Sequence, residues 1–126
     1  TVTVSKLLKK TVKTVTIPAT VTIDGYTFKV TAVANNVFKN ASRLKSVVIG
    51  ANVKSIGKSS FYKCKKLATI TFKGIKAPGV GKNAFKSGKS KVTVKVPKKM
   101  KKSQLNKLKK ALKKAGVKKA SYKKTK

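Results

Sequence analysis

The sequence has no histidine and no tryptophan, one acidic side chain (Asp24) and one cysteine (Cys64). These absences exclude most catalytic chemistry, because there is no carboxylate pair for glycoside hydrolysis and no histidine to activate a nucleophile. They also leave no set of side chains that could ligate zinc, calcium or magnesium, and one cysteine cannot close an internal disulfide. We therefore expect a protein that is not an enzyme and that needs no cofactor and no metal.

Positive charge dominates what is present. The 126 residues contain 34 basic side chains, of which only Arg43 is an arginine, and the formal net charge is +33. Apolar residues still make up 40% of the chain, close to the globular average, so lysine replaces other polar residues and not core residues. We expect one folded domain with a polycationic surface and no transmembrane segment, because no run of about 18 apolar residues occurs.

A repeat is the most informative feature of the sequence. Its copies align on Phe38, Phe61 and Phe85, which are spaced by 23 and 24 residues. Apolar residues recur at fixed distances from each phenylalanine: Val33, Ile56 and Val80 before it, and Leu44 and Leu67, then Val47, Ile70 and Val94, then Ile49, Phe72 and Val96 after it. The alternation in the last two sets predicts a short strand, and the period is typical of a leucine-rich solenoid whose turns stack around one core.

The segments VTAVANNVFKNASRLKSVVI, VKSIGKSSFYKCKKLATITF and GVGKNAFKSGKSKVTVKVP resemble the BspA-like leucine-rich repeat family of bacterial surface proteins. The resemblance covers roughly Val12 to Pro97 and extends more weakly into the lysine-rich tail. It implies a β-rich leucine-rich-repeat solenoid with ~23-residue repeats, located outside the cell or on the cell wall. The family usually has Ala-Phe before the turn, which only Ala84-Phe85 keeps, and its usual cysteine survives only as Cys64.

An N-terminal half-repeat and a hairpin are expected before the repeats. Val12, Val15 and Ile17 fit the strand positions once more. Thr20 to Val30 predicts a β-hairpin around Asp24-Gly25, because both residues tolerate the positive φ of a type I′ turn. We expect this hairpin to cover the open N-terminal edge, so residues 1–30 form an N-terminal half-repeat and hairpin cap before three leucine-rich repeats in residues 31–97.

A basic helix and tail are expected in residues 98–126, after Pro97 ends the last strand. One helical face carries Leu105, Leu108, Leu112 and Ala115, with Ser103 as the N-cap and Gly116 at the C-terminal end. We expect this helix to cap the last repeat, because an exposed repeat end needs cover. The alternative is a cationic helix that lies on a membrane surface. Beyond it, residues 117–126 either add a short strand or fray.

The turns and the strands differ in surface chemistry. The outward strand positions are mostly hydroxyl-bearing: Thr14, Thr16, Ser46, Val48, Thr69, Thr71, Thr93 and Lys95. The turns beside the phenylalanines instead carry nine basic residues, which are our candidate partner-binding residues: Lys39, Arg43, Lys58, Lys63, Lys65, Lys66, Lys82, Lys86 and Lys89. Neighbouring turns lie about 4.8 Å apart, so equivalent lysines stack, which favours an anionic partner along that edge. The alternative is a solvated surface that reflects a general lysine bias.

The expected partner is an anionic cell-wall polymer, an acidic glycan or an acidic protein surface, bound by a secreted or cell-wall-associated adhesion module. Nucleic acid is the second choice, because arginine is nearly absent and few aromatic residues are free to stack on bases, Tyr62 being the exception. A membrane-active polypeptide is the third. Cys64 is expected to be a buried, inert thiol, with an intermolecular disulfide as the alternative.

Overall fold

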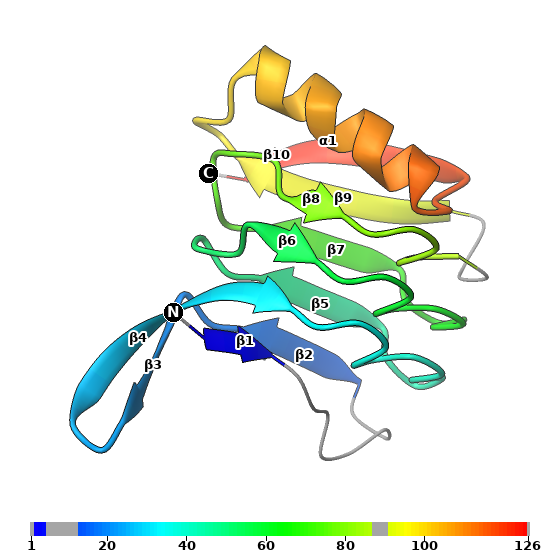
Figure 1. Ribbon diagram of the computed structural model, residues 1–126. Coiled ribbons are helices and arrows are strands. Elements are labelled where there is room, and N and C mark those ends of the chain that lie inside the picture. Colours follow the sequence, from blue (N-terminus) through cyan, green and yellow to red (C-terminus); the bar gives the residue numbers. More distant parts are fainter. Residues whose placement is uncertain (1, 5–12, 87–90, 126) are drawn as a thin grey trace.

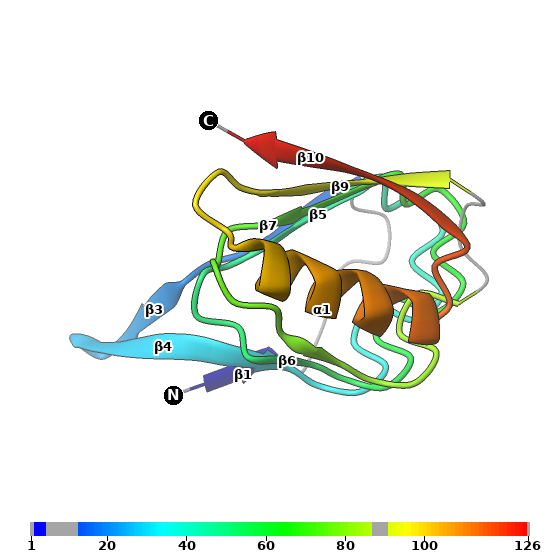
Figure 2. The ribbon, with the colours of Figure 1, turned by 90° about the horizontal axis from the view of Figure 1, so that it is seen from above.

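Two β-sheets, parallel except for one antiparallel pair of strands, face each other across the core of the computed structural model, which describes residues 2–4, 13–86 and 91–125 (Figure 1). Sheet A has the order β1 (Val2–Val4), β4 (Tyr26–Val33), β6 (Ser55–Ile56) and β8 (Gly79–Val80), and β3 (Thr20–Ile23) also pairs with β4. Sheet B has the order β10 (Lys119–Thr125), β9 (Lys91–Pro97), β7 (Thr69–Phe72), β5 (Ser46–Ile49) and β2 (Thr14–Ile17). The helix α1 (Lys102–Lys114) lies over the C-terminal end of the stacked turns (Figure 2).

Each repeat contributes one strand to each sheet. In sheet B, Ser46 of β5 pairs with Thr69 of β7, and Thr69 pairs with Thr93 of β9. In sheet A, Ile56 of β6 pairs with Val33 on one side and with Val80 on the other. The strand register therefore confirms the alignment that the phenylalanine spacing predicted.

The three repeat phenylalanines form a stack in the middle of the core. The ring centroids of Phe38 and Phe61, and of Phe61 and Phe85, are 5.0 Å apart, with interplanar angles of 11° and 2°. This spacing matches the roughly 4.8 Å between neighbouring strands, so identical side chains pack ring on ring. Phe61 has no exposed surface and forms the centre of the stack.

The turns beside the phenylalanines depend on backbone conformations that few residues adopt. Positive φ values occur two residues before each of the three repeat phenylalanines, at Asn36, Ser59 and Asn83. They also occur two residues after Phe38 and Phe61, at Asn40 and Lys63. Asparagine enters this left-handed region more readily than most residues, which accounts for three of the five. Gly57 and Gly81 permit close stacking, because a Cβ atom at either would lie 2.5 Å from the backbone of the preceding turn.

The hairpin has the predicted turn but not the predicted place. Asp24 and Gly25 have φ values of 51° and 81°, and Ile23 pairs antiparallel with Tyr26, as a type I′ turn requires. However, the hairpin projects sideways from the stack (Figures 1 and 2), and β1 is the neighbour of β4 on the N-terminal side of sheet A. The expectation that the hairpin covers the N-terminal edge is therefore wrong. The half-repeat strand β2 pairs with β5, while Val12 lies outside the described residues.

The helix α1 buries the predicted face and ends as predicted. Leu108 and Leu112 are fully buried. Gly116 has a φ of 108°. Its N–H donates to the carbonyl of Lys113 at 3.2 Å, and the N–H of Val117 donates to the carbonyl of Leu112 at 3.0 Å. These two bonds form a Schellman motif. The predicted N-cap is wrong, since Lys101 is the N-cap residue and makes no side-chain capping bond, and Ser103 lies inside the first turn.

The helix also continues the hydrogen bonding of the repeats. Phe38 donates its N–H to the carbonyl of Ser60 and Phe61 to that of Ala84, each at 2.7 Å. Phe85 donates in the same way to Ala115 at the end of α1, at 3.0 Å. The chain then forms β10, which pairs in parallel with β9 along seven residues, so the segment after the helix is a strand. The helix and β10 together replace a further repeat.

Phe61→Ala should lower the free energy of unfolding by about 3–5 kcal/mol, because it removes the central ring of the stack and leaves a cavity. Urea denaturation measures this loss. The matched control is Lys65→Ala in the same turn, an exposed position at which we expect a change within about 0.5 kcal/mol. A loss below about 1 kcal/mol for Phe61→Ala would contradict the central role of the stack.

Leu108→Lys should lower the thermal midpoint of the whole domain, because it places a charge where the helix packs on the last repeat and because neighbouring turns are coupled. Circular dichroism of the strand and helix signals measures the midpoint. Asn106→Lys adds the same charge at an exposed position of the same helix and should leave the midpoint nearly unchanged. Equal midpoints for the two variants would show that α1 does not cap the stack.

Candidate partner-binding site

Eight of the nine candidate basic residues belong to the described part of the chain, and they lie in the turns that lead from sheet A to sheet B, at the right of Figure 1. Seven of them are exposed: Arg43, Lys58, Lys63, Lys65, Lys66, Lys82 and Lys86. Lys39 is half-buried, and Lys89 lies outside the described residues. We call these eight described residues the basic edge.

Backbone hydrogen bonds fix the relative positions of the turns along the basic edge. The N–H of Asn36 bonds the carbonyl of Lys58 at 3.1 Å, and the N–H of Ser59 bonds that of Lys82 at 3.1 Å. Lys58 and Lys82 therefore occupy equivalent positions in adjacent turns. Neighbouring turns are about 5 Å apart. Two like charges at that distance repel by up to about 1 kcal/mol in water before salt screening.

Tyr62 interrupts a second row of equivalent positions. The residue after each phenylalanine is Lys39, Tyr62 or Lys86. The ammonium nitrogens of Lys39 and Lys63 lie 5.6 and 5.4 Å from the centroid of the Tyr62 ring, within the range of cation–π attraction. The aromatic ring thus takes the place of a third cation and attracts two of its neighbours.

The basic edge has no side-chain counter-ion. Asp24 is the only carboxylate side chain in the sequence, and it lies in the turn between β3 and β4, on the opposite side of the molecule (Figure 1). No carboxylate side chain therefore offsets the repulsion along the edge. Apart from the attraction of the Tyr62 ring for two of the lysines, relief depends on salt or a bound anion.

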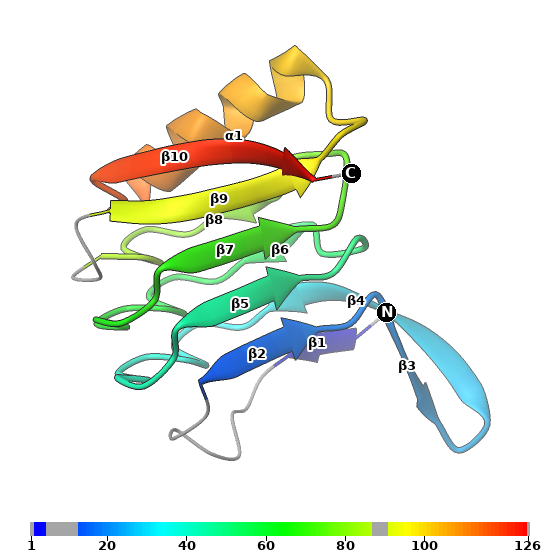
Figure 3. The same ribbon diagram turned by 180° about the vertical axis from the view of Figure 1, so that it is seen from behind.

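Figure 3 shows sheet B from its outward side. Hydroxyl-bearing residues recur at equivalent positions of its strands, as predicted. One row crosses all five strands in register: Thr14, Ser46, Thr69, Thr93 and Ser121. The hydroxyl of Ser46 lies 3.4 Å from that of Thr14. A second row becomes cationic towards the C-terminal end: Thr16, Val48, Thr71, Lys95 and Lys123. Ser121 and Lys123 had no sequence signal, because β10 does not follow the repeat pattern.

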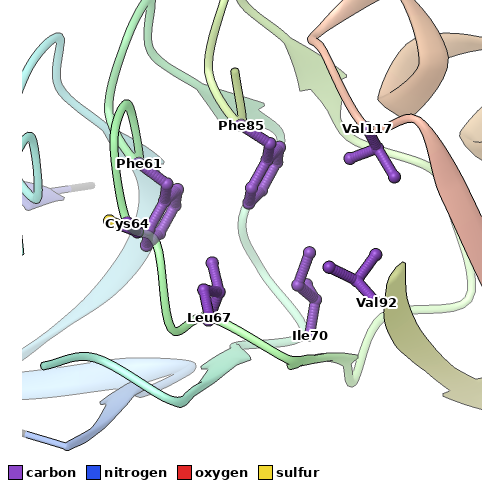
Figure 4. Close-up of a pocket in the computed structure, with 7 residues that line it drawn as sticks. All are labelled: Phe61, Cys64, Leu67, Ile70, Phe85, Val92 and Val117. Atoms are coloured by element: carbon purple, nitrogen blue, oxygen red, sulfur yellow. The ribbon is translucent and has the colours of Figure 1, made fainter. Parts of the chain in front are cut away.

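Cys64 is a buried, free thiol, as expected. Its Sγ–H donates to the carbonyl of Phe38 in the preceding turn at 3.1 Å. Burial raises the pKa of the Cys64 thiol to about 11, so the reactive thiolate is scarce at neutral pH. Beside it, Phe61, Phe85 and Val117 border a void of about 10 Å³ in the core (Figure 4), no larger than one water molecule requires. This region has no space for a substrate.

Neither a metal cluster nor a membrane span appears in the described part of the chain. No group of three or more histidine, cysteine or acidic side chains comes together there. The helix α1 has neither the length nor the hydropathy to cross a bilayer.

Parallel strands that alternate between two facing sheets, with a phenylalanine at the same position of successive turns, fit a protein built from stacked leucine-rich repeats. This chain belongs to the BspA-type family: the family described as "BspA type Leucine rich repeat region (6 copies)" matches residues 31–115. A leucine-rich cell surface protein from Faecalibacterium prausnitzii A2-165 has a similar solved structure, with 26% sequence identity and a TM-score of 0.55. The match covers 70% of this chain but only 30% of that protein. No curated protein sequence matches the chain significantly.

Tyr62→Lys should destabilise the fold by about 1 kcal/mol at low salt, because it places three equivalent cations in one row. The loss should largely disappear at an ionic strength of about 1 M, where the Debye length is about 3 Å. Thermal unfolding at two salt concentrations measures both effects. Tyr62→Gln is the control, since it removes the ring without adding charge; if both variants respond equally to salt, cations along the edge do not repel measurably.

Proposed function

We propose that this protein is a non-catalytic binding or adhesion module that acts outside the cell or on the cell wall and contacts anionic partners through the basic edge. The observation that carries this proposal is the set of eight described cations in successive turns, with no carboxylate side chain near them. The place of action is inferred from the family and from the leucine-rich cell surface protein that shares the fold.

The chemistry of the edge suits a flexible polyanion. Equivalent positions recur at about 4.8 Å from turn to turn, so a polymer that carries phosphate or carboxylate groups can meet several cations along the stack. Lysine is a compact, mobile point charge that does not impose the planar, two-point geometry of arginine. The contacts are therefore non-directional, and release of counter-ions supplies much of the binding free energy.

The surroundings of the edge favour a wall polymer or an acidic glycan over a nucleic acid. The hydroxyl rows of sheet B begin next to the basic turns, where Thr69 follows Lys66 by three residues. Serine and threonine hydroxyls both donate and accept hydrogen bonds, which suits the hydroxyl groups of sugars. Tyr62, the residue best placed to stack on a base, is half-buried and already has two ammonium groups near its ring.

A variant in which three lysines are replaced by neutral residues tests the proposal. Replacing Lys63, Lys65 and Lys66 with glutamine removes three cations from one turn. For a nucleic acid probe, the slope of log affinity against log salt should fall by roughly two to three, since each neutralised phosphate contributes about 0.7–0.9. Affinity for a purified anionic wall polymer and for a sulfated glycan should fall in parallel, while the fold stays intact.

The matched control replaces Lys107, Lys110 and Lys113, three exposed lysines of α1, with glutamine. It removes the same charge from another surface and should change binding much less. If both triples weaken binding equally, the protein is a diffuse polycation without a basic-edge site. Tighter binding to duplex DNA than to the wall polymer or the glycan would instead support a nucleic-acid function, and leakage of anionic vesicles would support a membrane-active one.

A further inference from the structure

A cleft of about 550 Å³ lies on the side opposite the basic edge. It is bordered by the part of β4 that carries the hairpin and by the loops that follow β5 and β7, towards the left of Figure 1. Its lining combines three lysines with apolar and small side chains: Lys29, Thr31, Asn52, Lys54, Ile75 and Lys76 are the residues that matter here.

In the described part of the chain, one edge of β4 is unpaired at Thr27 and Lys29, beside this cleft. The N–H of Val30 bonds the carbonyl of Ala19 at 2.9 Å, on the β3 side of the strand. Because backbone groups alternate along a strand, those of Thr27 and Lys29 point to the other side, away from β3. The neighbour on that side, β6, pairs only with Ala32 and Val33. The residue before β6, Lys54, donates its N–H to the carbonyl of Thr31 at 2.7 Å, so the open part of the edge ends there. Within residues 2–4, 13–86 and 91–125, the N–H groups of Thr27 and Lys29 therefore have no backbone partner.

The walls of the cleft are held in place by hydrogen bonds. The Asn52 side chain in the loop after β5 donates to the carbonyl of Ala19 at the base of the hairpin, at 2.9 Å. In the loop after β7, the N–H of Ala77 donates to Oε1 of Gln104 on α1, at 3.0 Å. A ligand would therefore meet a largely preformed site and lose less entropy on binding.

Ile75 gives the cleft an exposed apolar border. The loop after β7 spans residues 73–78 and is one residue longer than its equivalent, residues 50–54 after β5. Ile75 lies in the longer loop, and its side chain is 53% exposed. The spacing from Phe61 to Phe85 is one residue longer than the spacing from Phe38 to Phe61. The additional residue is thus located in this loop, beside the cleft, together with the exposed Ile75.

We propose that β4 binds an extended acidic peptide segment in this cleft by strand addition. The peptide backbone pairs with Thr27 and Lys29 on the open edge of the strand, as in other cases where a peptide joins an exposed sheet edge. Acidic side chains of the peptide meet Lys29, Lys54 and Lys76, and an apolar side chain packs on Ile75. This partner and this surface are distinct from the polyanion and the basic edge, so either proposal can fail without the other.

Two proline variants test the strand pairing. Thr27→Pro removes an outward N–H from the open edge of β4, whereas Thr22→Pro removes one from the outer edge of β3, directly opposite in the same hairpin. Both variants also lose the 3.4 Å contact between the Thr22 and Thr27 hydroxyls. The probe is a fluorescent eight-residue peptide that alternates glutamate with valine. Thr27→Pro should weaken its binding about tenfold, as expected for a lost backbone hydrogen bond and the steric block, and Thr22→Pro should not.

Peptide variants keep the test decisive if a proline variant fails to fold. N-methylation of alternate peptide nitrogens on one side should abolish binding to the unaltered protein, and methylation on the other side should leave it intact. Ile75→Ser and Lys29→Gln should each weaken binding, while affinity for the anionic wall polymer stays unchanged. Binding that is indifferent to N-methylation, or equal effects of the two proline variants, would overturn strand addition and leave only electrostatic attraction.

Discussion

The distance between neighbouring turns is the constraint on which the rest of this structure depends. Parallel pairing in both sheets fixes it at about 4.8 Å, and the phenylalanine rings stack at 5.0 Å because they follow the same spacing. Gly57 and Gly81 are required where a side chain would collide with the preceding turn. The buried thiol of Cys64 donates to the carbonyl of Phe38 in the preceding turn, so it too joins neighbouring turns.

The same constraint turns single surface residues into rows. A lysine in one turn lies beside the equivalent lysine in the next turn, and the two charges repel. The only carboxylate side chain, that of Asp24, is in the hairpin and does not lie between them. Tyr62 relieves one such row with its ring, while Lys58 and Lys82 remain adjacent. Hydroxyl groups on sheet B are multiplied in the same way. The chemistry of each face is thus set by very few repeat positions.

The repeats could be predicted because they are periodic. The parts of the structure that depart from the repeat could not be predicted in this way. The strand register, the phenylalanine core, the I′ turn at Asp24-Gly25 and the apolar face of α1 follow from local patterns that tertiary contacts reinforce. The direction of the hairpin does not, because no local pattern indicated that β1 would lie beside β4. The capping role expected of Ser103 failed because the helix begins two residues earlier than that cap requires, at Lys102, with Lys101 as the N-cap residue. The eight described basic residues were found from the sequence, but the cleft beside Ile75 arises only where the hairpin and two loops meet.

The bond from Phe85 to Ala115 is the same bond that joins one repeat to the next. The C-terminal helix therefore adds, to the packing of Leu108 and Leu112, the same backbone connection that joins one repeat to the next. If copies of the repeat were duplicated or deleted before this junction, the last phenylalanine would still donate its N–H to the end of the terminal helix. Each change would lengthen or shorten the molecule by one strand spacing, about 4.8 Å. Evolution can in this way adjust the reach of the surface in equal steps without redesigning its end.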